Sequence, residues 1–259
     1  MKVSIITKPA EFLSLKREWN SLMERCHHPS VFISHEWFKS WWEAFGEDFK
    51  LSVYRIKEEN RIVGFAPFMR NNNALFFLAG EEVTDYCDFI FEEDDTDIFF
   101  NALLQAVQSG GNPPQRLELI NIRGDSPSVI GLTRNAARNG IPCVIFPMEV
   151  APVLELPDSY ERYLSSLERK KRHELRRKIR RAGELPELRV RSAHGSGDQL
   201  DGIEDFIVLH RSSGSGKQEF WEKKGTEDFF RAAFQGLSEK GWARMDSPVS
   251  YTHLTLPTN

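Results

Sequence analysis

The sequence predicts an α/β chain of the mixed α+β kind, and two observations indicate this class. Short segments with strand-like alternation are interleaved with segments whose apolar residues recur every three or four positions, as on one face of a helix. The 259 residues are 40% hydrophobic and 28% charged, which excludes collagen-like, coiled-coil, disulfide-rich miniature and wholly disordered chains. This length allows one large domain or two smaller ones.

The first part of the chain begins with a strand and two helices. A short β-like pattern covers residues 3–7, and helical spacing follows over residues 12–26. Ser34 is a plausible N-cap for a second helix that Gly46 ends. The next segments read as strands at 51–55, 61–69, 75–78 and 86–91, with turns at 58–60 and 71–73. The order then becomes helix 98–107, strand 116–120, helix 129–138 and strand 143–146.

Prolines punctuate the middle of the chain at a regular interval. They recur every five residues, at Pro142, Pro147, Pro152 and Pro157. Proline cannot donate to a strand ladder or continue a helix interior. We therefore expect residues 148–157 to be an extended connector between two domains.

The second part of the chain begins at Asp158, which resembles an N-cap with Glu161 three positions later. An apolar stripe from Tyr160 to Ala182 predicts a helix or helix pair with one packed face. We then expect strand 188–193, loop 194–198, helix 203–210 and loop 212–216. A last helix should follow Thr226, and residues 242–245 should begin a strand.

Cysteine usage and the N-terminus give no sign of export. The three cysteines are widely spaced without a C-x-x-C pair, so neither a disulfide framework nor a cysteine zinc site is indicated, and no histidine spacing suggests a metal. The apolar stretch at residues 3–6 is too short for a signal peptide or a membrane span. A cytoplasmic protein without a metal is the expectation.

No sequence motif identifies a reaction. G-x-S-x-G, H-E-x-x-H and G-x-G-x-x-G are all missing from the sequence. The string SSGSGK at 212–217 lacks the first glycine of a phosphate-binding loop, where Arg211 stands, and the hydroxyl residue after the lysine, where Gln218 stands. We therefore predict a connector at 212–217, and no catalytic residue can be named.

The net charge of −4 hides two segregated segments. Residues 81–97 carry nine carboxylates and no Lys or Arg, whereas residues 169–181 carry nine basic side chains and one acid. The basic segment could be a solvated helix face, a nucleic-acid contact or a local patch for a phosphorylated ligand. It has no interleaved aromatics, and the rest of the chain is acidic, so nucleic acid is disfavoured. We expect contacts to an anion from Arg172, Arg176, Arg177 and Arg180.

The acidic segment contains a tighter group that could line a cleft. Asp85, Tyr86 and Asp88 fall within four residues and could bind an amine or sugar hydroxyls, which makes them the expected acceptor-binding residues. Glu92 to Asp95 should instead be solvated.

Five strings in the sequence are informative as a set: VFISHEWFKSWWEAFG, RIVGFAPFMR, TDYCDFIF, YERYLSSLERKKRHELRRKIRRAGE and FIVLHRSS. Together they resemble the CelD-like branch of the GNAT acyltransferases, a branch related to the Fem aminoacyltransferases. The resemblance implies two tandem GNAT-like domains, at 1–147 and 158–246, the second incomplete. The end of the chain, SYTHLTLPTN, resembles translated sequencing-adapter read-through. We therefore expect 247–259 to be a non-native tail.

The resemblance also implies acetyl-CoA, or a related acyl-CoA, as the cofactor of the intact protein. GNAT domains bind its pyrophosphate on backbone N–H groups at a helix N-terminus after the fourth strand. In the first domain this place is residues 79–99, where the acidic segment would repel a pyrophosphate. We therefore expect the first domain to be a degenerate GNAT-like domain that does not bind the cofactor. In the second domain the corresponding loop would lie beyond residue 245, so we expect this chain to be inactive and its helix at 229–237 to lack cover.

The function implied is transfer of an acyl group to an amine or amino sugar in cell-envelope or exopolysaccharide synthesis. A Fem-like, tRNA-dependent aminoacyltransferase with a peptidoglycan-precursor acceptor is one alternative, and a non-catalytic ligand-binding protein on the same scaffold is another. The partners expected are a small-molecule, sugar or peptide-precursor acceptor, with tRNA only in the Fem-like alternative.

Overall fold

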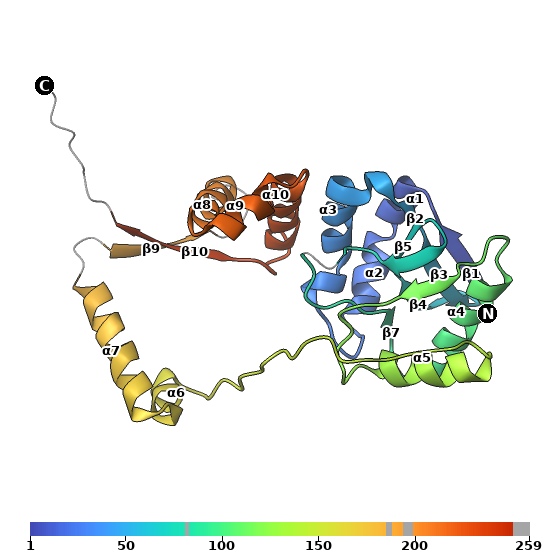
Figure 1. The fold of residues 1–259 in the computed structure, drawn as a ribbon, viewed down its shortest axis with the longest axis horizontal. Helices are drawn as coiled ribbons and strands as arrows, with labels where there is room; N and C mark the ends of the chain where they lie inside the picture. Colours follow the sequence, from blue (N-terminus) through green and yellow to red (C-terminus); the bar gives the residue numbers. More distant parts are fainter. Residues whose placement is uncertain (81–82, 185–187, 194–198, 251–259) are drawn as a thin grey trace, which may run out of the picture. The chain divides into compact units, whose positions relative to one another are not determined.

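The computed structural model describes residues 1–80, 83–184, 188–193 and 199–250 (Figure 1). The chain divides into two compact units. Unit 1 consists of Met1–Met148 with Gly195–Ala243, and unit 2 consists of Glu149–His194 with Arg244–Asn259. The mixed composition of strands and helices confirms the predicted α/β class.

A long antiparallel hairpin organises the sheets of unit 1. One arm contains β2 (Lys50–Leu51) and β3 (Val53–Glu58), and the other contains β4 (Arg61–Ala66) and β5 (Phe68–Asn71). The Ser52 N–H donates to the Phe68 carbonyl at 3.0 Å, which joins the two halves of the hairpin. The predicted turns are confirmed: Glu59 and Asn72 adopt the left-handed region, with φ of 51° and 50°.

Two strands line the outer side of the β4–β5 arm, and the chain leaves the sheet between them. In β6 (Ala74–Phe77), Phe77 pairs with Phe68, and the Leu78 N–H then donates to the Pro67 carbonyl. In β7 (Ile90–Phe91), Ile90 pairs with Phe65. Residues 79, 80 and 83–89, here called the 79–89 segment, therefore lie outside the ladder opposite Ala66. Most of the strand predicted at 86–91 belongs to this segment.

The sheets are completed at both edges. β1 (Lys2–Ile6) pairs antiparallel with β3, and β8 (Arg116–Glu118) pairs parallel with β6. The strand orders are β1-β3-β4-β7 and β2-β5-β6-β8. The crossover from β6 to β8 contains the 3-10 helix η3 (Glu93–Asp95) and α4 (Thr96–Ser109). The strand predicted at 143–146 is wrong, because residues 141–157 pair with no strand.

Helices cover both faces of these strands. Adjacent residues of β4 point to opposite faces, so Phe65 joins the core under α1 to α3 and Ala66 joins the core under α4. α4 also packs against α5 (Pro127–Arg138). The single helix predicted at 12–26 breaks at Leu15 into α1 (Pro9–Ser14) and α2 (Lys16–Met23).

Helix α3 (His35–Phe45) matches its sequence prediction closely. The Ser34 hydroxyl accepts from the Trp37 N–H at 3.2 Å as the N-cap, and Gly46 is the C-cap. Short 3-10 helices flank α3, namely η1 (Val31–Ile33) and η2 (Gly46–Asp48).

Unit 1 also contains three helices from the second part of the chain: α8 (Gln199–Ser212), α9 (Ser215–Glu222) and α10 (Thr226–Ser238). α10 packs on α3, where the fully buried Phe229 lies 5.0 Å from Trp37 and 5.6 Å from Phe45, measured between ring centroids. The expected lack of cover for this helix is therefore wrong, and so is the simple loop expected at 212–216, since α9 begins within it. Gly225, not Thr226, is the N-cap of α10.

Unit 2 contains α6 (Tyr160–Ser166), α7 (Arg169–Gly183) and a two-stranded antiparallel sheet of β9 (Leu188–Ala193) with β10 (Met245–Ser250). The strand predicted at 188–193 is confirmed, and the Ser159 hydroxyl, not Asp158, caps α6. The packed face predicted for the basic helix is wrong, because α7 has no buried residue. The loop predicted at 194–198 lies outside the described residues.

The domain limits expected from the sequence, 1–147 and 158–246, stay a prediction, and the two compact units divide the chain differently. The helices between 199 and 238 lie with residues 1–148, because the apolar face of α10 is buried on α3. Within the described residues, no helix is both long and apolar enough to cross a membrane.

A substitution at Gly225 tests whether α10 packs closely on α3. The φ of Gly225 is +88°, and a Cβ atom there would lie 2.5 Å from the Ala44 carbonyl oxygen. Gly225→Ala should therefore lower the free energy of unfolding by about 2 kcal/mol, through backbone strain and the clash. Chemical denaturation measures this. Gly216→Ala is the control, because no atom lies within 4 Å of that site, and it should be neutral or slightly stabilising; equal losses in both variants would contradict this close packing.

Candidate functional site

The 79–89 segment carries the residues expected to bind an acceptor, and buried hydrogen bonds hold it in place. The Trp37 indole N–H donates to the Thr84 hydroxyl at 3.0 Å, and both groups are buried. Asn121 fixes the segment at two points: its side-chain amide donates to the Thr84 carbonyl at 2.8 Å, and its own carbonyl accepts from the Cys87 N–H at 3.0 Å. Asn121 (φ +59°) and Ala79 (φ +74°) both adopt left-handed conformations. This backbone is over-determined by its contacts, as functional loops often are.

The Asp88 carboxylate has a structural role, because it accepts hydrogen bonds from within the fold. It accepts them from the Ser126 hydroxyl at 2.6 Å, the Ser128 hydroxyl at 2.5 Å and the Phe89 N–H at 2.8 Å. Ser126 is the N-cap of α5, so Asp88 ties the 79–89 segment to the start of that helix. Burial raises the pKa of Asp88 because it disfavours the charged form, although the hydroxyl donors oppose the shift. Direct contact of Asp88 with an acceptor, as expected from the sequence, does not fit these bonds.

Tyr86 and Asp85 are the accessible part of the segment. Asp85 is exposed, and the half-buried Tyr86 ring lies 6.0 Å from Phe32. The Arg123 guanidinium lies 5.7 Å from the Tyr86 ring centroid and donates twice to Asp125, at 3.0 and 2.8 Å. The hydrogen bond from Arg123 lowers the pKa of Asp125 to about 2. Tyr86 thus lies beside a fixed ion pair, and the exposed Asp85 carboxylate, which has no partner among the described residues, could meet a cation or hydroxyl.

A small cavity lies beneath the segment. Its volume is about 10 Å³, room for one water molecule, and its lining includes Cys26, His28, Asp88, Ser126 and Ser128. Burial raises the pKa of Cys26 to about 11 and that of Cys87 to about 12. Both thiols are therefore neutral near pH 7 and poor nucleophiles.

The acidic residues after the segment are held by partners, so their predicted solvation is only partly right. Asp95 is buried and pairs with Arg61 through both carboxylate oxygens. Glu92 accepts from Arg25 at 2.8 Å, and Glu93 lies 2.8 Å from the His27 ring nitrogen. These carboxylates precede the N-terminus of α4, where a cofactor pyrophosphate would need positive potential. The residues at this place do not fit an acyl-CoA.

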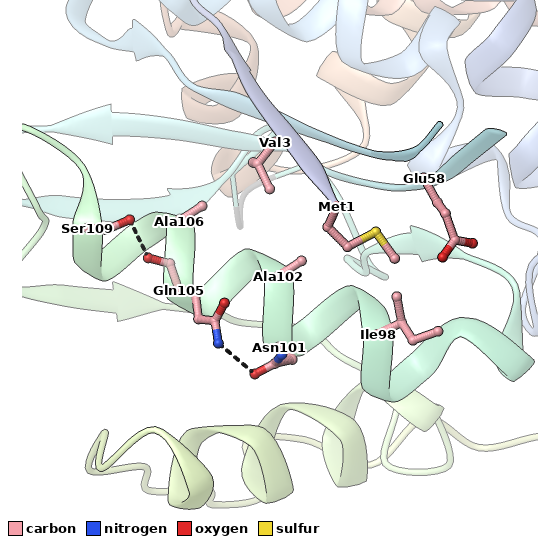
Figure 2. Close-up of a pocket in the computed structure, with 9 residues that line it drawn as sticks. All are labelled: Met1, Val3, Glu58, Ile98, Asn101, Ala102, Gln105, Ala106 and Ser109. Carbon is pink, nitrogen blue, oxygen red and sulfur yellow. Dashed lines mark hydrogen bonds between the residues drawn. The ribbon is translucent and has the colours of Figure 1, made fainter. Parts of the chain in front are cut away.

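A larger groove lies elsewhere in unit 1, between β1 and α4 (Figure 2). Its volume is about 480 Å³, and its floor includes Val3, Ala102 and Ala106. Glu58 is the only ionisable side chain among the residues that line it. This groove contains none of the residues expected from the sequence and offers no pair of groups for proton transfer.

The basic helix α7 presents three of the four expected anion contacts on one face. Arg172, Arg176 and Arg180 follow one another at intervals of four residues, and Arg177 lies on an adjacent side. The Arg172 guanidinium donates to the Ser165 carbonyl at 3.3 Å, and Arg180 lies 3.5 Å from Glu184. Arg176 and Arg177 have no ion pair among the described residues. This exposed face has the fixed forks that suit phosphate oxygens.

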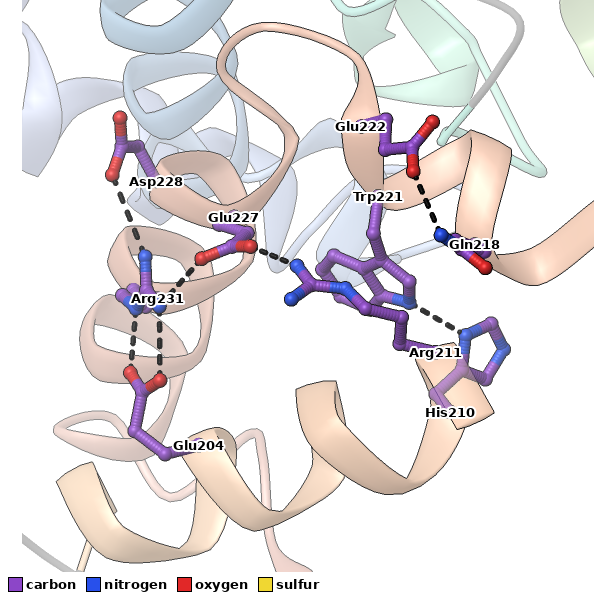
Figure 3. Close-up of polar contacts among 9 residues, drawn as sticks. All are labelled: Glu204, His210, Arg211, Gln218, Trp221, Glu222, Glu227, Asp228 and Arg231. Carbon is purple, nitrogen blue, oxygen red and sulfur yellow. Dashed lines mark hydrogen bonds and ion pairs between the residues drawn. The ribbon is translucent and has the colours of Figure 1, made fainter. Parts of the chain in front are cut away.

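Sequence reasoning missed a charged cluster that links α8 to α10 (Figure 3). Arg231 donates to Glu204 at 2.5 and 2.9 Å and to Glu227 at 2.7 Å, and Glu227 also accepts from Arg211. The donors Arg211 and Arg231 lower the pKa of Glu227. These residues are 27 positions apart at the widest, so only the fold could bring them together. All the carboxylates of this cluster are paired, which indicates that the cluster stabilises the packing of α8 on α10 and does not bind a ligand.

His210 lies beside this cluster with a defined hydrogen bond. The Trp221 indole N–H donates to His210 Nδ1 at 2.8 Å (Figure 3). The neutral ring therefore carries its proton on Nε2. Desolvation lowers the pKa of His210.

Comparisons with known proteins agree with the fold. Residues 169–247 match a family model described as an acetyltransferase (GNAT) domain. The fold is similar to a solved structure titled "Crystal structure of FemX", with a TM-score of 0.55 and 13% sequence identity over 93% of this chain. The chain spans 56% of the FemX chain. No curated protein sequence matches it.

The chain thus contains a GNAT acetyltransferase-like domain, which includes α7, and shares the fold of FemX over most of its length. This confirms the GNAT-like part of the sequence expectation.

The raised pKa of Asp88 predicts a pH-dependent stability. A carboxyl group whose folded-state pKa is raised stabilises the fold below its unfolded pKa of about 3.9, and this contribution is lost as pH rises through the folded-state value. The Tm of Asp88→Asn should therefore improve relative to that of the unmodified chain between pH 4 and pH 7. The pKa of Asp125 is lowered to about 2, so the control Asp125→Asn should lose Tm relative to the unmodified chain as pH rises from about 2 to 4 and should change little between pH 4 and pH 7. A Tm difference for Asp88→Asn that does not vary with pH would contradict the burial of its charge.

Proposed function

We propose that this chain belongs to an N-acyltransferase that moves an acetyl or related acyl group from acyl-CoA to an amine or amino sugar. The match of residues 169–247 to the GNAT acetyltransferase domain carries this proposal. The acceptor class and the link to cell-envelope or exopolysaccharide synthesis are parts of the proposal that rest on the sequence resemblance, and the cytoplasmic location is a part that rests on the cysteine spacing.

In this proposal the arginines of α7 bind phosphate groups of the charged ligand. Acyl-CoA, when bound, supplies a thioester carbonyl that an uncharged amine can attack. Arg172, Arg176 and Arg180 share one exposed face, and Arg177 adds a further cation beside them. They fit a phosphate-bearing ligand because each guanidinium can donate two parallel hydrogen bonds. The carboxylates before α4 do not fit one, so the first GNAT-like region would contribute acceptor contacts only.

The acceptor would lie at the 79–89 segment. The Asp85 carboxylate can hold an ammonium or hydroxyl group, and the Tyr86 ring offers a flat apolar surface with a phenol at its edge. Asp88 acts as a positioning residue, since its hydrogen bonds to Ser126 and Ser128 fix the segment.

A second candidate is a Fem-like, tRNA-dependent aminoacyltransferase, which the similarity to the FemX fold favours. In that case the α7 arginines would contact phosphates of a charged tRNA or of the acceptor precursor. Transfer measured with labelled acetyl-CoA and, separately, with labelled aminoacyl-tRNA distinguishes the two candidates. Labelled acetyl product on an amine supports the first proposal, and aminoacyl transfer alone would overturn it.

Removing two arginines from one face of α7 tests the phosphate contact. Arg172→Gln with Arg176→Gln should raise the KM for the charged ligand roughly 100-fold or more and change kcat little, since charge-assisted hydrogen bonds contribute about 1.5–3 kcal/mol each. Steady-state kinetics or direct titration measures this.

The matched control for this variant is Lys170→Gln with Arg181→Gln, which removes two charges from the opposite side of the same helix. Equal effects of the two double variants would point to general charge attraction and contradict a specific contact.

A further inference from the structure

Unit 2 has an electrostatic character opposite to that of unit 1. Its residues sum to a formal charge of +4, whereas those of unit 1 sum to −8. The excess comes from α7, in which nine Lys and Arg side chains accompany one Glu, and none is buried. Among the described residues, several have no ion pair: Arg169, Lys170, Arg172, Arg176, Arg177 and Arg181. This density of unpaired cations on one helix favours binding to an anionic partner.

Apolar side chains are exposed in the same unit. The extended chain that leads into α6 and α7 (Figure 1) leaves Val150 91%, Val153 81% and Leu156 82% exposed. Tyr160, at the start of α6, and Ile179, on α7, are each 48% exposed. Leu175 and Ile179 lie one turn apart on α7 and form an apolar stripe flanked by basic residues. Such exposure of aliphatic groups marks an interaction surface.

We propose that α7, together with residues 150–160, docks unit 2 on the surface of a membrane that contains anionic lipids. A basic helix with an apolar stripe lies in the lipid interface with its cations near the headgroups, and aliphatic and tyrosine side chains enter the boundary region. The cations of α7 would then contact the anionic headgroups, and the exposed apolar side chains of unit 2 would contact the acyl chains. The absence of any membrane-crossing helix among the described residues is consistent with a peripheral contact.

A nucleic acid explains these observations less well. Phosphates would satisfy the cations, but the exposed aliphatic residues Val150, Val153 and Leu156 would gain no cover. α7 also carries no aromatic side chain on which bases could stack. The membrane inference goes beyond the proposed transfer reaction and does not depend on it, because lipid binding can be measured without an acyl donor or an acceptor.

Co-sedimentation of the full chain with lipid vesicles tests the proposal. Binding is expected to vesicles of equal parts phosphatidylcholine and phosphatidylglycerol and not to phosphatidylcholine alone, and it should weaken with added salt. The variant with Lys171, Arg172 and Arg176 all changed to Gln removes cations that flank the apolar stripe, and it should bind about 100-fold more weakly, from about fivefold per cation. The variant Val153→Ser with Leu156→Ser should also bind at least 10-fold more weakly.

A matched control removes three exposed lysines of unit 1, through Lys2→Gln, Lys8→Gln and Lys50→Gln, and should bind as the unmodified chain does. Circular dichroism of each variant verifies that helix content is kept. Equal binding to neutral and anionic vesicles, no effect of the aliphatic variant, or displacement from vesicles by a stoichiometric amount of single-stranded RNA would each overturn the proposal.

Discussion

Packing on both sides of helix α3 is the interaction on which unit 1 depends. On the sheet side, Phe38 lies 5.6 Å from Trp19, and Trp19 stacks on Phe65 of β4 at 4.7 Å. On the other side, Trp37 and Phe45 contact Phe229 of α10. Helix α3, buried on two faces, joins the beginning of the chain to residues more than 180 positions later. This explains why unit 1 is built from two segments that are separated in the sequence.

Polar groups at the start of α3 fix its orientation. Glu36 is buried, accepts from Asn20 at 2.7 Å and lies 3.2 Å from the Lys16 ammonium. Burial opposes its ionisation, but these donors outweigh that effect and lower the pKa of Glu36. Asn20 also accepts from the His35 N–H, which anchors the first turn of α3 on α2. Trp37, one residue after Glu36, then reaches Thr84, so the position of α3 sets the position of the 79–89 segment.

Local rules predicted much of the fold, and long-range contacts account for what they missed. The cap at Ser34, the turns at Glu59 and Asn72, and the spacing of α4 and α5 are all readable from neighbouring residues. The sequence did not predict that the 79–89 segment leaves the ladder, because Tyr86–Phe91 has the residue pattern of a strand. The anchors of this segment, Trp37 and Asn121, lie more than 30 positions away. The cover of α10 was missed for the same reason, since its partner helix is near the N-terminus.

Acceptor binding by Asp85, Tyr86 and Asp88 stays a prediction. The hydrogen bonds that hold Asp88 could not be predicted, because no local pattern connects it to Ser126 and Ser128. The sequence predicts that Arg172, Arg176 and Arg180 share one face of α7, because residues four positions apart lie on the same side of a helix. It did not predict the exposure of α7, since the apolar stripe suggested a packed helix where the structure leaves every residue of α7 unburied.

The most direct measurement of the link between α3 and the GNAT-matched region is a double-mutant cycle on Phe45→Leu and Phe229→Leu. Their rings lie 5.6 Å apart, one on each helix. If α10 is seated on α3, the free energies of unfolding should show a coupling of about 0.5–1.5 kcal/mol between the two substitutions. Effects that add to within about 0.3 kcal/mol would contradict this contact and the unit that it builds.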